Sequence, residues 1–218
     1  MRRILLPFAF LLLLAGCGTP APVRLRLTLH TADPAQRTEL IGAAQRVITS
    51  RLVRITEEKP AIAMTTEGSG ALLSVTIADP KIADEITQEM LRPFSLMLML
   101  KSTGSGGDIQ VQNVGWFTKT DITEKEVTWV QSGQTTGRQS EVAIRFTADG
   151  QKRMEALFKG NQGRSIGLFV RGKLMSILPS TGKAPGENLM ITGTPSPEIA
   201  AIFADDVNVG TLVTFSLP

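Results

Sequence analysis

The chain has 218 residues, of which 42% are hydrophobic and 20% are charged, and its formal net charge is +3 at pH 7. This length allows a sizeable hydrophobic core in one or two domains, and so small a net charge gives no support for a nucleic-acid partner. The sequence contains a single cysteine, so the fold must rest on its hydrophobic core and not on an internal disulfide.

The first residues have the layout of a secretory signal peptide. Two arginines at positions 2–3 form a cationic head, residues 4–14 are apolar, and small residues at 15–16 precede Cys17. The eleven apolar residues would rise about 16 Å as a helix, roughly half of the ~30 Å hydrocarbon core, so the run is too short for a permanent transmembrane helix. We therefore expect residues 1–16 to be a leader, whose removal lowers the formal charge from +3 to +1.

The residues that end this leader, Leu14-Ala15-Gly16-Cys17, resemble the lipobox of bacterial lipoproteins. The resemblance implies cleavage between Gly16 and Cys17 and a covalent lipid on Cys17, which would hold the mature chain to a membrane through a tether at residues 17–22. Gly18, and not an aspartate, follows the cysteine. By the same resemblance this favours the outer membrane over the inner one. An ordinary cleaved signal peptide with a free thiol is the alternative.

The first half of the mature chain predicts one α+β module. Its expected elements are a half-buried strand at 23–30, a helix at 33–55, a hairpin at 61–77, a helix that begins at Asp79, and a strand at 94–101. Asp33 and Asp79 are each followed by a proline, a combination that favours a helix start. The order strand, helix, strand, strand, helix, strand is that of a ferredoxin-like, or split βαβ, module, expected here over residues 23–101.

The second half predicts a further module of the same kind. Residues 102–113 are rich in glycine and serine and predict a linker. The elements expected beyond it are strands within 115–130 around a short helix near Thr120, a strand at 140–147, a helix at 147–161, a hairpin at 165–178, a strand at 188–193, a helix at 196–207 and a strand at 210–217. The predicted fold class is therefore α+β, with two ferredoxin-like modules at 23–101 and 114–218, antiparallel or mixed sheets, and helices on one face.

Several short motifs resemble the first periplasmic domain of SecD and SecDF, membrane subunits of the bacterial protein-export machinery. They are Asp79-Pro80 in the first half and, in the second, Asp149-Gly150, Gly163-Arg164, the turn Arg171-Gly172-Lys173 and the step Ile191-Thr192-Gly193. The resemblance implies a base module at 23–101, a head module at 114–218, a location that faces the periplasm, and contact with exported or unfolded chains.

Two departures from that family limit what the resemblance implies. SecD continues into transmembrane helices whose acidic residues couple proton flow to export, and none is found before Pro218. Arg171 stands in a turn where the family usually has an aspartate. We therefore expect the fold of the periplasmic domain but not the proton-driven motor.

Residues suited to catalysis are scarce. His30 is the only histidine and alternates outward on its expected strand, so we interpret it as a surface residue, and a zinc site would need carboxylates alone. The segment 133–140 lacks the Gly-Lys-Ser/Thr ending of a phosphate loop. Asp205 and Asp206 are a candidate cation site, although adjacent acids at the end of a helix more often face water. We expect no enzyme activity, no metal site and no cofactor beyond the lipid on Cys17.

Trp116 and Trp129 are the candidate partner-binding residues, because exposed tryptophans suit the binding of apolar peptide segments. Core packing of both is the alternative. The leading hypothesis is a lipid-anchored, non-catalytic envelope protein that binds an exported chain or an envelope complex. The alternatives are a structural or assembly lipoprotein that recognises a folded partner, and an envelope sensor of a small ligand or a metal.

Overall fold

The computed structural model describes residues 22–56, 61–68, 70–135 and 139–218. The predicted leader, the cleavage site at Gly16 and the lipidation site at Cys17 lie outside the described residues. The described part contains four α-helices and twelve strands in three sheets, which confirms the α+β class. Within these segments no helix combines the length and the apolarity that a membrane crossing requires.

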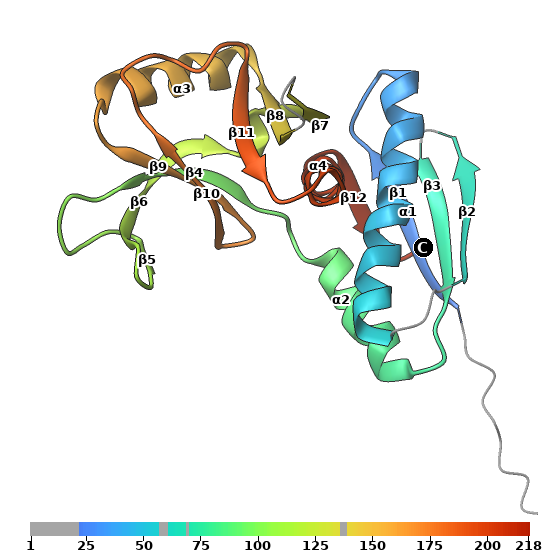
Figure 1. The fold of residues 1–218 in the computed structure, drawn as a ribbon. Helices are drawn as coiled ribbons and strands as arrows, with labels where there is room; N and C mark the ends of the chain where they lie inside the picture. The colour runs from blue at the N-terminus through green and yellow to red at the C-terminus, as the bar shows by residue number, and fades with distance from the viewer. Residues whose placement is uncertain (1–21, 57–60, 69, 136–138) are drawn as a thin grey trace, which may run out of the picture.

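The first unit, here called the base, is a four-stranded antiparallel sheet covered by two helices (Figure 1). Its strand order is β12-β1-β3-β2, with β1 at Val23–Leu29, β2 at Ala61–Glu67, β3 at Gly70–Thr76 and β12 at Val213–Ser216. The helices are α1 (Pro34–Thr56) and α2 (Pro80–Leu91). Alternation in β1 buries Leu25, Leu27 and Leu29 under them, as the sequence pattern predicts.

Both base helices begin as their sequences indicate. The Asp33 carboxylate accepts a hydrogen bond from the Ala35 amide at 2.8 Å, and the Asp79 carboxylate accepts one from the Lys81 amide at 2.8 Å. A proline occupies the first position of each helix, where its missing N–H costs nothing.

The fourth strand of the base is not the one that the sequence suggests. The segment 94–101 forms β4 (Leu96–Lys101), which lies between β9 and β6 in a different sheet, and β12 from the C-terminus takes its expected place beside β1. The burial of β4 explains this choice, because Leu98 packs in a core on one face of its sheet and Met99 in a core on the other. A strand that is apolar on both faces suits a central position.

The second unit, the head, contains two sheets where the sequence predicts one ferredoxin-like sheet. The larger has the order β10-β9-β4-β6-β5 and the smaller β11-β8-β7. The additional strands are β5 (Ile109–Val111), β6 (Gly115–Thr123), β7 (Val127–Gln134), β8 (Ser140–Phe146), β9 (Ser165–Val170), β10 (Lys173–Pro179) and β11 (Asn188–Thr194), and the head helix is α3 (Ala148–Gly160). The expected linker at 102–113 contains β5, which pairs with β6. The chain therefore leaves the base after α2.

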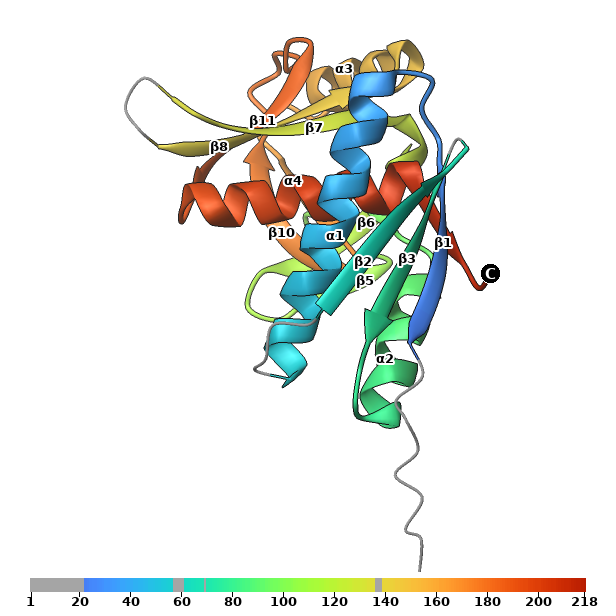
Figure 2. The ribbon, with the colours of Figure 1, turned by 90° about the vertical axis from the view of Figure 1, so that its right-hand side faces the viewer.

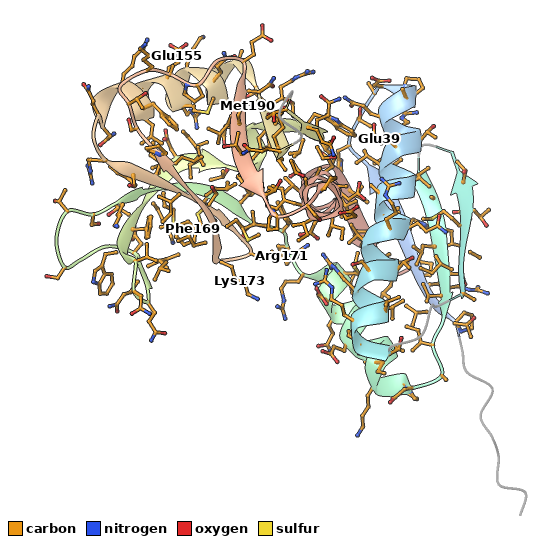
Figure 3. All side chains as sticks on the ribbon, viewed as in Figure 1. Glu39, Glu155, Phe169, Arg171, Lys173 and Met190 are labelled. Atoms are coloured by element: carbon orange, nitrogen blue, oxygen red, sulfur yellow. The ribbon has the colours of Figure 1, made fainter. Side chains whose placement is uncertain are left out.

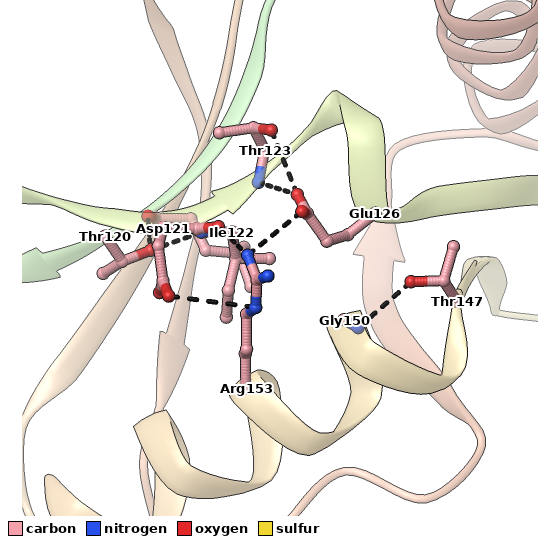
Figure 4. A network of polar contacts seen from close by, with 9 residues as sticks. Thr120, Asp121, Ile122, Thr123, Glu126, Thr147, Gly150 and Arg153 are labelled. Carbon is pink, nitrogen blue, oxygen red and sulfur yellow. Dashed lines mark hydrogen bonds and ion pairs between the residues drawn. The ribbon is translucent and has the colours of Figure 1, made fainter.

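A polar network fixes α3 against the turn between β6 and β7 (Figure 4). The short helix expected near Thr120 is instead the end of β6, followed by a 3-10 turn at Glu124–Glu126. Arg153 of α3 donates hydrogen bonds to the Glu126 carboxylate at 3.2 Å and to the Asp121 carbonyl at 3.1 Å. A β-carbon on Gly150 would lie 2.6 Å from that of Glu126. The glycine of the Asp149-Gly150 motif therefore permits this close approach.

Helix α4 (Pro197–Leu212) lies between the two units and belongs to both cores (Figures 1 and 2). Its residues Ala200, Ala204 and Val207 pack in the main core of the head, whereas Val209 packs in the core of the base. The buried side chain of Asn208 accepts a hydrogen bond from the Val130 amide and donates one to the Val130 carbonyl, both at 2.8 Å. These two bonds hold α4 to β7.

Candidate functional site

A groove, here called the boundary groove, follows the border between base and head and has a volume of about 390 Å³. It is lined by Val47, Ser50, Arg51 and Arg54 of α1, by Glu89 of α2, by Ile199, Ile202, Phe203 and Asp206 of α4, and by Val170, Arg171, Lys173 and Met175 of β9, β10 and their turn. Within each of α1 and α4 the lining residues are spaced i, i+3, i+4, i+7, the spacing of one helix face. Figure 2 shows α4 crossing α1, with β10 below α4.

One side of the boundary groove is apolar and exposed. Met175 is 52% exposed, Ile199 48% and Ile202 44%. Strand β10 is also an edge of the five-stranded sheet, so the backbone groups on its outer side have no strand partner. Exposed apolar side chains gathered beside a hollow indicate a surface for a partner.

The floor of the groove carries an ion-pair cluster centred on Asp206. Arg51 of α1 contacts the Asp206 carboxylate at 2.5 Å and that of Glu89 at 3.2 Å. Arg171 contacts the Asp206 carboxylate from the head side at 3.4 Å. The Asp206 carboxylate on α4 therefore binds an arginine of the base and an arginine of the head.

The neighbouring carboxylate, Asp205, is also paired. Arg46 of α1 donates two hydrogen bonds to it, from Nε at 2.7 Å and from Nη2 at 2.8 Å, a bidentate geometry that is among the stronger ionic contacts. This hydrogen bonding raises the pKa of Arg46 above its ordinary value. Both acids of the candidate cation site thus bind arginines of α1, and among the described residues no group of three or more potential metal ligands occurs.

Arg171 also links the β9–β10 turn to the segment that leaves the base. Its amide donates to the Ser95 carbonyl at 2.8 Å, and its guanidinium lies 5.1 Å from the centroid of the Phe94 ring, within cation–π range. An aspartate at this position, as the SecD resemblance leads one to expect, would face Asp206 with a like charge. The departure at 171 therefore belongs to the ion-pair cluster.

Two further cations lie at the rim of the boundary groove. Arg54 and Lys173 are exposed, and neither forms an ion pair with the residues that the structure describes. The guanidinium of Arg54 donates a hydrogen bond to the Ser50 hydroxyl at 3.2 Å. Figure 3 labels Lys173 beside Arg171 at the end of the hairpin that points toward the base.

The tryptophans predicted to bind a partner do not come together. Trp129 is 8% exposed and packs in the core of the base although it belongs to β7, so its indole is not available at the surface. Trp116 is half-buried on β6, opposite Gln110 of the edge strand β5, and does not line the boundary groove. His30 is exposed, as predicted, and its ring forms a hydrogen bond with the Thr214 hydroxyl at 2.7 Å.

Asp206, Arg171 and Lys173 are singled out by the sequence, but the sequence does not predict that they line one groove with residues of α1. The available signal was the mixture of apolar and charged residues on single faces of α1 and α4, such as Val47 with Arg54 and Ile202 with Asp206. A helix face that is neither wholly apolar nor wholly polar indicates a boundary with another element. Which element meets it depends on the tertiary fold.

The described residues at the groove combine arginine, lysine, carboxylate and aliphatic groups. Such an arrangement suits binding through apolar contacts and charge. Every carboxylate on its floor is engaged by an arginine, so neither Glu89 nor Asp206 has the environment of a general base.

This chain is similar to known proteins in its fold, as seen in solved structures, and not in its sequence. No protein-family model matches the chain, and no curated protein matches it significantly. Solved structures do match, and all those described here are of SecDF, a membrane component that enhances protein export.

That SecDF structure has a TM-score of 0.50 at 15% identity, with 88% of this chain and 97% of the matched chain covered. The super-membrane-facing form of SecDF gives 0.51 at 15% identity and covers 90% of this chain, and SecDF from Thermus thermophilus gives 0.51 at 15% identity and covers 91%. This chain spans 29% and 30% of those two longer proteins. The resemblance predicted from the motifs is thus confirmed at the level of the fold.

Proposed function

We propose that this chain is a lipid-anchored, non-catalytic protein of the cell envelope that binds exported or envelope proteins through the boundary groove. The observation that carries the proposal is the set of exposed apolar side chains, Met175, Ile199 and Ile202, gathered at this groove on a fold like that of SecDF. Aliphatic side chains held open at the border of two units bind other apolar chains more readily than they bind a polar metabolite.

The anchor and the location belong to the same proposal. A diacylglycerol on Cys17 would keep the domain at the membrane surface, because two or more acyl chains make dissociation very slow. The tether enters β1 at Val23, so the base would lie next to the membrane. The outer membrane is the proposed site, facing the periplasm.

The proposal is tested with a photo-crosslinking amino acid at Ile202 in intact cells. Met190 is the matched control, because it is 39% exposed against 44% for Ile202 and lies on β11, away from the hairpin that carries Arg171 (Figure 3). Crosslinks to other envelope or exported proteins are expected at Ile202 and not at Met190. Equal labelling of the two positions would refute a binding role for the groove.

The same experiment in a Cys17→Ser background tests the anchor. The protein is expected to move from the membrane fraction to the soluble fraction and to lose crosslinks to membrane-bound partners. An unchanged membrane fraction would contradict the lipid anchor without bearing on the groove.

A further inference from the structure

We infer that the boundary groove selects polypeptide segments in which an apolar stretch lies a few residues from an acidic side chain, and that Arg54 and Lys173 bind this carboxylate. The inference rests on the proposed function, since it names the class of segment that the groove takes. It is carried by the charge of the groove, the position of its apolar wall and the edge strand beside it.

The side chains that line the groove carry a net positive charge. Four cationic side chains line it, Arg51, Arg54, Arg171 and Lys173, against the two carboxylates of Glu89 and Asp206. Arg51 binds both of these carboxylates, and Arg171 binds that of Asp206. The two rim cations have no such partner among the described residues, so an incoming carboxylate meets two compensating charges, whereas an incoming lysine meets repulsion.

The opposite end of the groove has the reverse character. A smaller hollow of about 260 Å³ continues from it, shares Val47, Ser50 and Ile202 with it, and is also lined by Glu198 and by the ion pair of Arg46 with Asp205. A hydrogen bond from the Ser196 hydroxyl lowers the pKa of Glu198, which keeps that carboxylate charged. The groove is therefore cationic at the hairpin end and acidic beyond its apolar wall.

This polarity sets the spacing between the apolar and the acidic side chains of the bound segment. Val47 and Arg54 are seven residues apart on α1, which corresponds to about 10 Å along the helix. An extended chain covers that length in about three residues. A segment with its apolar side chains about three residues before or after a glutamate would thus place these side chains on the apolar wall and the glutamate beside Arg54 and Lys173.

The geometry favours a polypeptide over a lipid or a small anion. Lys173 and Met175 belong to β10, an edge strand whose outer side pairs with no strand among the described residues. An extended chain beside this strand gains backbone hydrogen bonds in addition to its side-chain contacts, which neither an acyl chain nor an isolated carboxylate does.

Binding of labelled peptides to the full-length protein in neutral detergent tests the inference. The probes are three Gly/Ser-based fluorescein peptides that carry a leucine pair about three residues from a glutamate, a glutamine or a lysine. Fluorescence anisotropy is expected to give an affinity for the glutamate peptide roughly threefold above the glutamine peptide and about tenfold above the lysine peptide. Added salt is expected to narrow these ratios.

Reversing the charge of Arg54 and Lys173 tests whether these two residues cause the preference for the glutamate peptide. Arg54→Glu/Lys173→Glu is expected to invert the preference toward the lysine peptide, and Arg54→Gln/Lys173→Gln to abolish it without inversion. The control Arg24→Glu/Lys183→Glu makes the same change in net charge at two exposed positions outside the groove and is expected to keep the wild-type order. Circular dichroism verifies that each variant is folded.

The outcomes separate the inference from the proposed function. Equal affinities for the three peptides, or an acid preference that survives the reversal, would overturn the inference and leave the crosslinking result at Ile202 standing. Absence of binding by all three would also overturn it. The proposed function fails with it only if Ile202 also gives no specific crosslinks.

Discussion

Phe94 lies between a cation and a helix backbone at the border of the two units. The Arg171 guanidinium stacks on its ring at 5.1 Å, and the ring packs so close to α4 that a β-carbon on Gly210 would lie 2.2 Å from Cδ2 of Phe94. Gly210 does not have a positive φ, so its backbone conformation does not require glycine. Glycine is needed here because a β-carbon would collide with the Phe94 ring. The three residues come from three separate segments of the chain.

Gly210→Ala is therefore expected to destabilise the protein although alanine is the better helix former. The helix propensity gained is about 1 kcal/mol, whereas forcing a methyl group into a packed site costs about 1–3 kcal/mol, and Phe94 must also move. We expect a net loss of about 1–2 kcal/mol in the free energy of unfolding, measured by urea denaturation.

The matched control is Gly42→Ala in α1. A β-carbon there would meet only the end of the flexible Arg46 side chain, at 3.3 Å, so the substitution is expected to stabilise by about 0.5–1 kcal/mol. The two changes are chemically identical and should have opposite signs. A gain in stability from Gly210→Ala would show that Phe94 is not confined in this way.

At the scale of elements, strand β12 from the end of the chain completes the sheet of the base. Its partner β1 pairs with β3 on the other side, so without β12 one edge of β1 would be left open. Val209 and Val213 from the end of the chain also belong to the core of the base. The base is thus built from two segments that are far apart in the sequence, with the head inserted between them.

A fragment of residues 22–101, which contains the module predicted at 23–101, is accordingly expected not to fold. It lacks β12 and leaves the apolar face of β4 without its head partners. Amide dispersion in a two-dimensional NMR spectrum is the measurement. A second fragment, in which residues 22–92 are joined by a Gly/Ser linker to 205–218, restores the missing strand and should give dispersed signals. A well-dispersed spectrum from 22–101 alone would contradict the topology described here.

At the scale of the whole molecule, α4 and Trp129 make the two units interdependent. Residues of α4 pack in both main cores, and Trp129 of the head packs in the core of the base. The ion pairs of Arg46, Arg51 and Arg171 with Asp205 and Asp206 cross the same border. The units therefore share their packing and are not joined only by linkers.

We expect the described part of the chain to unfold in one cooperative transition. In a Trp116→Phe variant the fluorescence reports Trp129 alone, and its urea midpoint should coincide with that of far-UV circular dichroism. Two separated transitions, with Trp129 following only one of them, would show that base and head are thermodynamically independent.

The local features of this protein could be predicted from its sequence. Helix starts at Asp33 and Asp79, the alternation of β1 and the positions of most strands depend on neighbours within a few residues, and the structure confirms them. The motifs also indicated the likeness to SecDF, and the fold agrees with it.

The arrangement of these elements was decided only by the tertiary structure. An apolar strand carries no sign of which sheet it will join, so β4 and β12 exchanged the places that chain order suggested. A buried tryptophan and an exposed one look alike in a sequence, so only the tertiary structure decides between the two interpretations of Trp129 and places it in the core of the base. The boundary groove is assembled from α1, α2, α4 and the β9–β10 hairpin, because burial of apolar area is non-directional and long-range packing selects among many locally equivalent pairings.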